Sequence, residues 1–174
     1  MIEYVLLVDE QDNHTGVMEK LQAHQEGLLH RAISIFIFND KNELLLQQRA
    51  AEKYHSPLLW TNTCCSHPRP GEVVIDAAHR RLGEEMNMTC VLKHQFNFTY
   101  RAVLEDGLIE HEFDHVFFGY TNVQPDPNPE EVHTWKYLSL ENIEQEIQNS
   151  PERYTSWFKL MLAKIKSIRN ERID

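Results

Sequence analysis

The segment NTCCSHPRPGE, residues 62–72, places two adjacent thiols, Cys64 and Cys65, just ahead of an imidazole, His67. Such a group suits a zinc site, a packed turn, or a site at which a thiol exchanges a proton. A thiolate zinc site usually draws on a second cysteine pair. Only Cys90 remains elsewhere in the chain, which weakens the prediction of a zinc-binding module.

Imidazoles and carboxylates form a second candidate group of metal ligands: His24, His30, His67, Glu110 and Glu112. Glu110 and Glu112 are two positions apart, so on a strand both side chains point to one face. Imidazole nitrogens together with carboxylate oxygens suit Zn²⁺, Mn²⁺ or Mg²⁺. Spacing alone does not assemble ligands this far apart, and each residue taken singly reads as a surface histidine or an acidic edge.

A third group of acidic residues lies along a predicted helix. Glu72 lies at its start, and the side chains of Glu84 and Glu85 project from its last turn. Three such carboxylates can gather Mg²⁺, which usually bridges to substrate phosphate oxygens. The alternative is a surface helix with ion pairs four residues apart, Arg80–Glu84 and Arg81–Glu85.

Length, charge and composition limit the classes of protein to which this chain can belong. The chain has 174 residues, which predicts one domain over 1–174. A net charge of −10 disfavours nucleic-acid binding, so a polyanionic substrate needs local cations or metal ions. No apolar run approaches the ~20 residues of a membrane helix, and the odd cysteine count indicates reduced thiols. We expect a cytosolic protein.

Periodicity predicts the elements that must position these side chains. Alternating apolar residues indicate strands, and apolar residues at helical spacing indicate a helix. We expect strands near 4–10, 31–40, 42–49, 94–102, 110–121 and 133–140, and helices over 72–86, 139–149 and 155–168. Residues 9–16 read as a turn, and 31–49 as a hairpin. The sum is an α+β sandwich.

The spacing from Ser66 resembles the Nudix box, G-x5-E-x7-R-E-U-x-E-E-x-G-U, where U is a bulky apolar residue. The matching positions are Glu72, Arg80, Leu82, Glu84, Glu85 and Met88. Ser66 and Asn87 replace glycines, and Arg81 replaces a metal-binding glutamate. The loss of that glutamate disfavours ordinary pyrophosphate hydrolysis.

The block TNTCCSHP ahead of this altered box resembles the type 1 isopentenyl-diphosphate Δ-isomerases, a Nudix-fold family that moves a double bond and hydrolyses nothing. Further matching blocks are EKLQAHQEGLLHRAISIFIFN, LLLQQRA, FTYRA and GLIEHEFDHVF, and the resemblance covers residues 4–157. It implies a Nudix-type α/β/α sandwich with a mixed sheet and a central Nudix-like helix. The implied partner is a small allylic or homoallylic diphosphate.

The resemblance also implies roles for individual residues. Cys65 matches the catalytic thiol of the family. Glu112 matches a residue that is both a metal ligand and a proton donor or acceptor, and Tyr100 matches the tyrosine beside that residue. The implied ligands of one divalent ion (Zn²⁺, Mn²⁺ or Mg²⁺) are His24, His30, His67, Glu110 and Glu112. The implied contacts of the Mg²⁺-bound diphosphate are Glu85, Lys20, Arg49 and Lys53. Trp157 matches an aromatic beside the hydrocarbon tail, with core packing as the equal alternative. We assign the other histidines, His55 among them, to surface or packing, and Cys64 to a small buried apolar position.

The implied chemistry explains why these residue types are needed. Moving the double bond adds a proton to one carbon of an alkene and removes one from another, so an acid and a base must flank the substrate. Cys65 takes one face of the substrate, and Glu112 with Tyr100 takes the other.

The competing hypotheses are a Nudix hydrolase of a nucleoside or other diphosphate, and a zinc module built on Cys64, Cys65 and His67. The sequence names neither the metal nor the oligomeric state.

Overall fold

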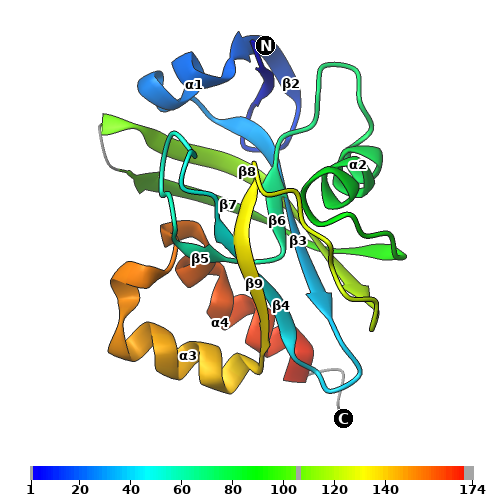
Figure 1. The fold of residues 1–174 in the computed structure, drawn as a ribbon. Coiled ribbons are helices and arrows are strands. Elements are labelled where there is room, and N and C mark those ends of the chain that lie inside the picture. Colours follow the sequence, from blue (N-terminus) through cyan, green and yellow to red (C-terminus); the bar gives the residue numbers. More distant parts are fainter. Residues whose placement is uncertain (1, 105–106, 171–174) are drawn as a thin grey trace.

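A computed structural model describes residues 2–104 and 107–170, and a mixed β-sheet forms its centre (Figure 1). Strand β3 (His30–Phe38) pairs in parallel with β8 (Ile109–Tyr120), which pairs antiparallel with β7 (Leu92–Val103). Strand β4 (Leu44–Arg49) forms a hairpin with β3 and pairs antiparallel with β9 (Val132–Leu138). The predicted hairpin over 31–49 is therefore confirmed.

Shorter strands and the helices complete the fold. The remaining strands are β1 (Tyr4–Val8), β2 (His14–Glu19), β5 (Trp60–Thr61) and β6 (Cys64–Ser66). The helices are α1 (Lys20–Glu26), α2 (Val74–Met86), α3 (Leu140–Asn149), α4 (Ser156–Asn170) and the 3-10 helix η2 (Pro151–Arg153). Within the described ranges, no helix has both the length and the apolar character needed to cross a membrane.

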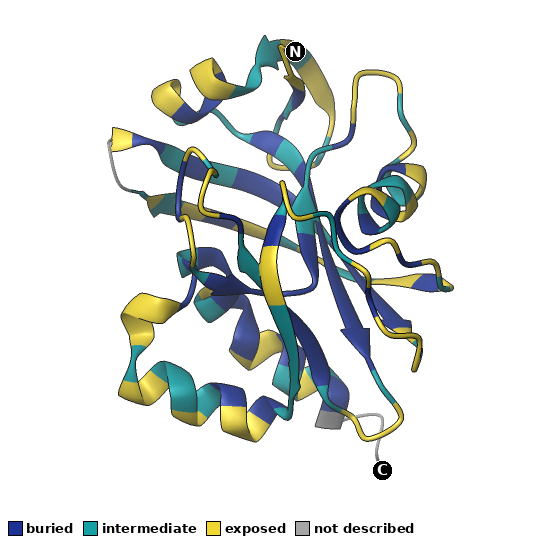
Figure 2. Ribbon diagram, viewed as in Figure 1, coloured by how far each residue is buried: buried dark blue, intermediate teal, exposed yellow. Residues whose placement is uncertain are grey.

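Strand β3 is apolar on both faces because helices cover both sides of the sheet. Its odd positions, such as Ile35, pack with Leu82 of α2 in one hydrophobic cluster. Its even positions, such as Phe36, pack with Phe158 of α4 in another. Successive side chains of a strand point to opposite faces, so one strand serves both cores. The buried stripes on these elements are visible in Figure 2, and the predicted α/β/α sandwich is confirmed.

The predicted helix over 72–86 and the predicted strands correspond to observed elements with small differences at their ends. The predicted cap of α3 is also present, since the Ser139 hydroxyl accepts a hydrogen bond from the Asn142 amide. The prediction of a turn over 9–16 is wrong at its end, because β2 begins at His14 and pairs with β1. The exposed residues of β2 carry little hydrophobic alternation to reveal it.

Helix α1 has no apolar periodicity, and its ends determine where it lies. The Glu19 carboxylate caps it by accepting hydrogen bonds from the amides of Leu21 and Gln22. The helix ends at Gly27, whose φ of 64° is left-handed. A Cβ atom there would lie 3.0 Å from the Ile109 side chain, so glycine suits this position on two grounds. The sharp end turns the chain from α1 straight into β3.

Candidate active site

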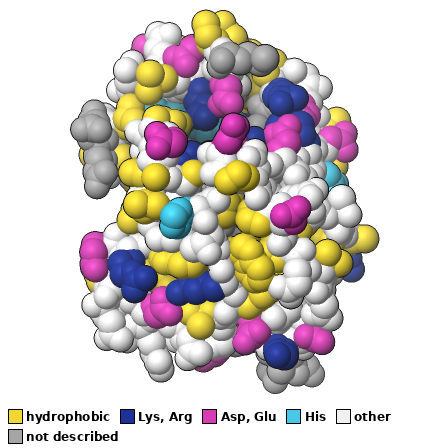
Figure 3. Space-filling view, viewed as in Figure 1, with side chains coloured by type: hydrophobic (Ala, Val, Ile, Leu, Met, Phe, Trp, Pro, Cys, Tyr) yellow, Lys and Arg dark blue, Asp and Glu magenta, His cyan; other side chains and the backbone are white. Residues whose placement is uncertain are grey.

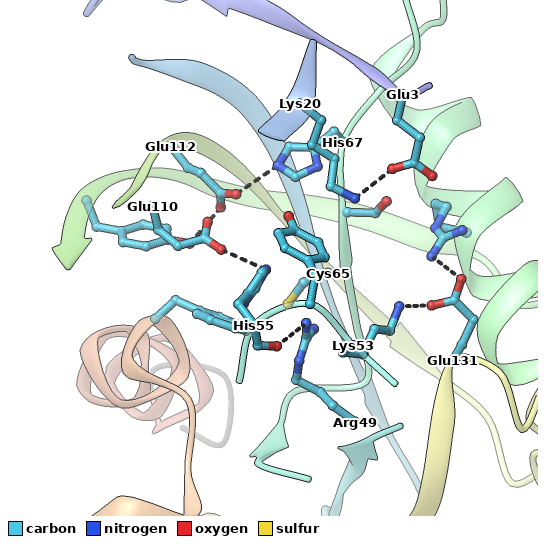
Figure 4. Close-up of a pocket in the computed structure, with 15 residues that line it drawn as sticks. Glu3, Lys20, Arg49, Lys53, His55, Cys65, His67, Glu110, Glu112 and Glu131 are labelled. Atoms are coloured by element: carbon cyan, nitrogen blue, oxygen red, sulfur yellow. Dashed lines mark hydrogen bonds and ion pairs between the residues drawn. The ribbon is translucent and has the colours of Figure 1, made fainter. Parts of the chain in front are cut away.

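Most of the predicted site residues line one cavity of about 140 Å³ (Figure 4). The predicted residues in its lining are Lys20, Arg49, Lys53, Cys65, His67, Tyr100, Glu110, Glu112 and Trp157. They come from α1, β4, β6, β7, β8, α4 and the loops after β4 and β6. Figure 3 shows basic side chains beside acidic ones in the upper part of this face. The fold therefore brings distant segments together, as the resemblance implies.

The half-buried Cys65 thiol on β6 lies in a polar corner of the cavity. Its Sγ donates to Oδ1 of Asn62 at 2.9 Å and lies 3.6 Å from Oγ of Ser34. The Ser34 hydroxyl in turn donates to Asp114 at 2.6 Å. Burial raises the pKa of Cys65, so the thiol holds its proton at neutral pH. Its neighbour Cys64 is fully buried in the α2 core, which confirms its predicted packing role.

Glu112 and Tyr100 form a hydrogen-bonded pair on a second wall of the cavity. They lie opposite each other in the β7–β8 ladder, and the Tyr100 hydroxyl donates to Oε2 of Glu112 at 2.6 Å. Burial raises the pKa of Tyr100. Burial alone also raises the pKa of Glu112, but the contacts with His30 and Tyr100 outweigh it and lower this pKa. The pair can thus hold a carboxylate beside a phenolic proton.

A cluster of histidines and carboxylates lies next to this pair. Ligand atoms of His24, His30, His67 and Glu112 all lie within 4.8 Å of one another. His67 Nε2 is 2.9 Å from Oε1 of Glu112, and His30 Nε2 is 3.6 Å from the same oxygen. Glu110 approaches from the same strand face, with Oε2 3.7 Å from His24 Nε2. The five predicted ligands are therefore neighbours in space.

The donor atoms of this cluster fit a divalent cation. His24 and His30 use Nδ1 to contact the backbone carbonyls of Lys20 and Leu28, at 2.7 and 2.8 Å. Such contacts fix the ring orientation and leave Nε2 for a ligand. The Nε2 atoms of both histidines and Oε2 of Glu110 are buried without a hydrogen-bond partner. A bound cation satisfies such atoms. Mixed nitrogen and oxygen donors suit Zn²⁺, Mn²⁺ or Mg²⁺.

Two further buried polar residues lie at or behind the site and were not predicted from the sequence: His55 lines the cavity, and Asp114 lies behind Ser34. His55 is buried, lines the cavity, and places Nε2 3.4 Å from Oε1 of Glu110. Burial lowers the pKa of His55 to about 3. Asp114 is fully buried, and burial raises its pKa. The alternation that links Glu110 to Glu112 continues to Asp114 and was a usable signal, whereas the irregular loop that carries His55 offers none.

The three predicted diphosphate-binding cations surround the mouth of the cavity, and each contacts an acceptor group. Lys20 Nζ lies 2.6 Å from a carboxylate oxygen of Glu3, and Lys53 forms an ion pair with Glu131. The Arg49 guanidinium donates to the backbone carbonyl of His55 at 3.0 Å. Lys20 and Lys53 are thus paired with carboxylates of this chain, whereas Arg49 contacts an uncharged acceptor.

The position of Trp157 is compatible with both roles that the sequence left open. Its side chain is buried, and its indole nitrogen donates to Oγ1 of Thr61 at 3.0 Å. It also lines the cavity, with the Arg49 guanidinium 5.5 Å from its ring centre. The same residue thus packs in the core and presents part of its ring to the cavity.

The carboxylates of α2 are neutralised by arginines of the same helix. Arg80 binds Glu72 through two contacts of 2.6 and 2.7 Å, and it contacts Glu84 at 3.1 Å. Arg81 binds Glu84 at 2.7 Å and the buried Glu85 at 2.5 Å, so both predicted pairs four residues apart are present. Arg81 lines the cavity and Glu85 does not. The arginine that interrupts the Nudix box therefore neutralises one of its remaining carboxylates.

Comparison with known proteins places this arrangement in a family. A NUDIX domain model matches residues 28–158. The chain is 56% identical over 161 residues to the isopentenyl-diphosphate Delta-isomerase of Pectobacterium atrosepticum, covering 92% of this chain and 90% of that protein. It is 52% identical over 170 residues to isopentenyl-diphosphate Delta-isomerase 2 of Aromatoleum aromaticum, covering 98% and 90%. The chain belongs to the isopentenyl-diphosphate Delta-isomerase family of Nudix proteins.

Solved structures agree with a Nudix fold for this isomerase-family chain. A protein from Deinococcus radiodurans matches with a TM-score of 0.80 at 19% identity, over 93% of this chain and 98% of that one. The MutT protein from Methanosarcina mazei matches with a TM-score of 0.68 at 18% identity, over 81% and 95%. At these identities the likeness concerns the fold alone. The family and the fold class predicted from the sequence are confirmed.

Proposed function

We propose that this protein converts isopentenyl diphosphate into dimethylallyl diphosphate, a 1,3-allylic proton shift that serves isoprenoid biosynthesis. One observation carries the proposal: Cys65 and Glu112 enter one cavity from β6 and β8, two strands that pair with β3. A proton donor and a proton acceptor can thus both reach a substrate bound in this cavity. Relatives named as this isomerase share about half of the sequence, which supports the isomerase over a nucleotide hydrolase.

The side chains divide the acid and base work between them. Cys65 holds its proton because desolvation raises its pKa, so it delivers a proton to one carbon of the alkene and recovers it in the reverse reaction. Glu112 is the ionised partner that accepts a proton from the other carbon, with the Tyr100 hydroxyl held against it. Trp157 places an aromatic face in the cavity, which stabilises developing positive charge and offers no nucleophile.

The histidine–glutamate cluster would hold one divalent cation through His24, His30, His67, Glu110 and Glu112. When bound, such an ion draws electron density from its carboxylate ligands and lowers their proton affinity. Zn²⁺, Mn²⁺ and Mg²⁺ are the candidates from the donor set. Burial lowers the pKa of His67, which keeps this ring neutral and able to act as a ligand.

Lys20, Arg49 and Lys53 bind the diphosphate in this proposal, and the second cation, Mg²⁺, arrives with it. The predicted role of Glu85 as a Mg²⁺ contact stays a prediction. Its two oxygens accept hydrogen bonds from Arg81 and Gln47, so any metal contact shares the carboxylate with them. A cytosolic location and a single domain over 1–174 are further predictions, as is the absence of nucleic-acid and membrane partners.

An isomerisation assay with added Mg²⁺ tests the proposal on the wild type, Cys65→Ala and Cys90→Ala. We expect Cys65→Ala to lower kcat at least about a thousandfold, within the range for loss of an acid–base group. Cys90 lies outside the cavity lining, so its variant serves as the matched thiol control. Release of phosphate or nucleotide from nucleoside diphosphates, with indifference to Cys65, would instead identify a hydrolase. An inactive, folded wild type overturns the proposal.

A further inference from the structure

His55 is a fourth histidine beside the metal-ligand cluster, and neither the sequence pattern nor the family resemblance assigns it a role there. It lies in the loop between β4 and β5, and its ring is buried against Tyr54 and Trp157, with ring centres 4.4 and 5.7 Å away. Its Nε2 atom points at Oε1 of Glu110, 3.4 Å away (Figure 4). A buried imidazole directed at a ligand carboxylate requires an explanation.

The potential ligands fall into two overlapping groups. One contains His24, His30, His67 and Glu112, and the other contains His24, His55 and Glu110. His24 belongs to both, but its Nδ1 atom contacts the Lys20 carbonyl at 2.7 Å, so only Nε2 is available. One imidazole nitrogen has one lone pair and binds one ion. The two groups therefore cannot be two separate ion sites filled at the same time.

The two oxygens of Glu110 show how the groups combine. Oε2 faces His24 Nε2 at 3.7 Å and is buried without a hydrogen-bond partner. Oε1 faces His55 instead, at 3.4 Å. One oxygen is thus free to bind an ion next to His24, while the other faces an imidazole nitrogen. A neutral imidazole carries one N–H, which suits donation to a carboxylate.

We propose that His55 is a positioning residue of the metal site, which donates its Nε2–H to Oε1 of Glu110 and so directs Oε2 toward the ion. This inference rests on the proposed metal site and deepens it. Ligand carboxylates are commonly held by such outer hydrogen bonds, whose loss costs about 10- to 100-fold in metal affinity or activity. At 3.4 Å the contact is longer than an ideal hydrogen bond.

Three variants separate this role from ordinary packing. His55→Phe keeps an aromatic ring against Tyr54 and Trp157 but removes the donor. His55→Gln keeps a donor of similar reach, and His133→Gln is the control on an exposed histidine of β9. Co²⁺ affinity, measured by competition with a chelator, and the visible spectrum of bound Co²⁺ are the readouts. Circular dichroism and thermal unfolding verify that each variant is folded.

We expect His55→Phe to weaken Co²⁺ binding about 10- to 100-fold while the spectrum of the saturated protein keeps its band positions. His55→Gln should restore affinity to within about threefold, and His133→Gln should match the wild type. Unchanged affinity in a folded His55→Phe variant overturns the inference. A shifted Co²⁺ spectrum in both His55 variants overturns it too, because His55 would then be a direct ligand.

The same proteins, assayed for isomerisation, keep the two proposals distinguishable. A wild type that binds Co²⁺ and responds to His55→Phe, yet isomerises nothing, supports the inference and refutes the proposed function. If the wild type is active and the His55→Phe variant has the same Co²⁺ affinity, the inference alone is refuted. If the His30→Ala variant binds Co²⁺ as tightly as the wild type, the metal site itself is refuted, and the inference with it.

Discussion

The histidine–glutamate cluster and the carboxylates of α2 are two acidic regions close to one cavity, and they differ in what neutralises them. In the cluster, buried atoms such as Nε2 of His30 and Oε2 of Glu110 have no hydrogen-bond partner. On α2, Glu72 and Glu85 are bound by Arg80 and Arg81. The comparison teaches that carboxylates at metal-site spacing do not by themselves make a metal site. The decisive property is whether the chain's own cations already occupy them.

The largest expected effect comes from removing one carboxylate of each region in turn. Glu112→Gln removes both a ligand and a proton acceptor, so we expect isomerisation to fall about 10²- to 10⁴-fold. Glu84→Gln alters a surface residue already paired with Arg80 and Arg81, and should keep activity within about threefold. Steady-state kinetics and elemental analysis of bound metal measure both variants. Equal losses of activity and metal would erase the distinction between the regions.

Removing the arginine from the second region tests whether its carboxylates depend on internal cations. Arg81→Ala leaves Glu85, only 4% exposed, without its guanidinium partner. Breaking one side of a buried ion pair costs about 3–5 kcal/mol in the free energy of unfolding. Equilibrium urea denaturation measures the change, and Arg101→Ala, an exposed position on β7, is the control. A loss no greater than that of the control would show that Glu85 does not need Arg81.

The smallest effect is expected at Glu72, where the pair with Arg80 is partly exposed. The hydrogen bond from Arg80 lowers the pKa of Glu72 below its ordinary 4.5. The pair therefore stabilises the fold above about pH 4.5, and this contribution is lost as the pH falls through the lowered pKa. We expect about 1 kcal/mol or less. Urea denaturation at about pH 7 and about pH 3.5 should show a smaller pH effect in Glu72→Gln than in the wild type. An identical pH dependence would contradict this assignment.

Features that depend on local pattern are predicted well from the sequence. The two-residue spacing of Glu110 and Glu112 correctly placed both on one strand face, and the spacing of Arg81 and Glu85 correctly predicted their ion pair. The pairing of Tyr100 with Glu112 had to come from the family resemblance, because it depends on the register of β7 against β8.

The rest depends on contacts between distant segments. His55 becomes a site residue only because its loop folds over Glu110 of β8. Helix α1, which carries Lys20 and His24, is short and polar, and its position is set by the Glu19 cap and by Gly27. Neither feature leaves a periodic signal in the chain. Such residues become visible only when the sheet register is known.

Strand β3 pairs with β6 on one edge and with β8 on the other, and this pairing fixes where the two proton-carrying side chains lie. Cys65 is the ladder partner of Ser34, and Glu112 the partner of His30, two positions of β3 on the same face. Neighbouring strands are about 4.8 Å apart, so β6 and β8 lie about two such spacings apart across β3, and the two ladder partners lie four residues, or about 13 Å, apart along it. The pairing of the strands therefore sets the distance between the two proton-carrying residues. The apolar residues packed under the helices can be substituted without changing that distance. A register slip of one residue, in contrast, would turn either side chain to the opposite face of the sheet.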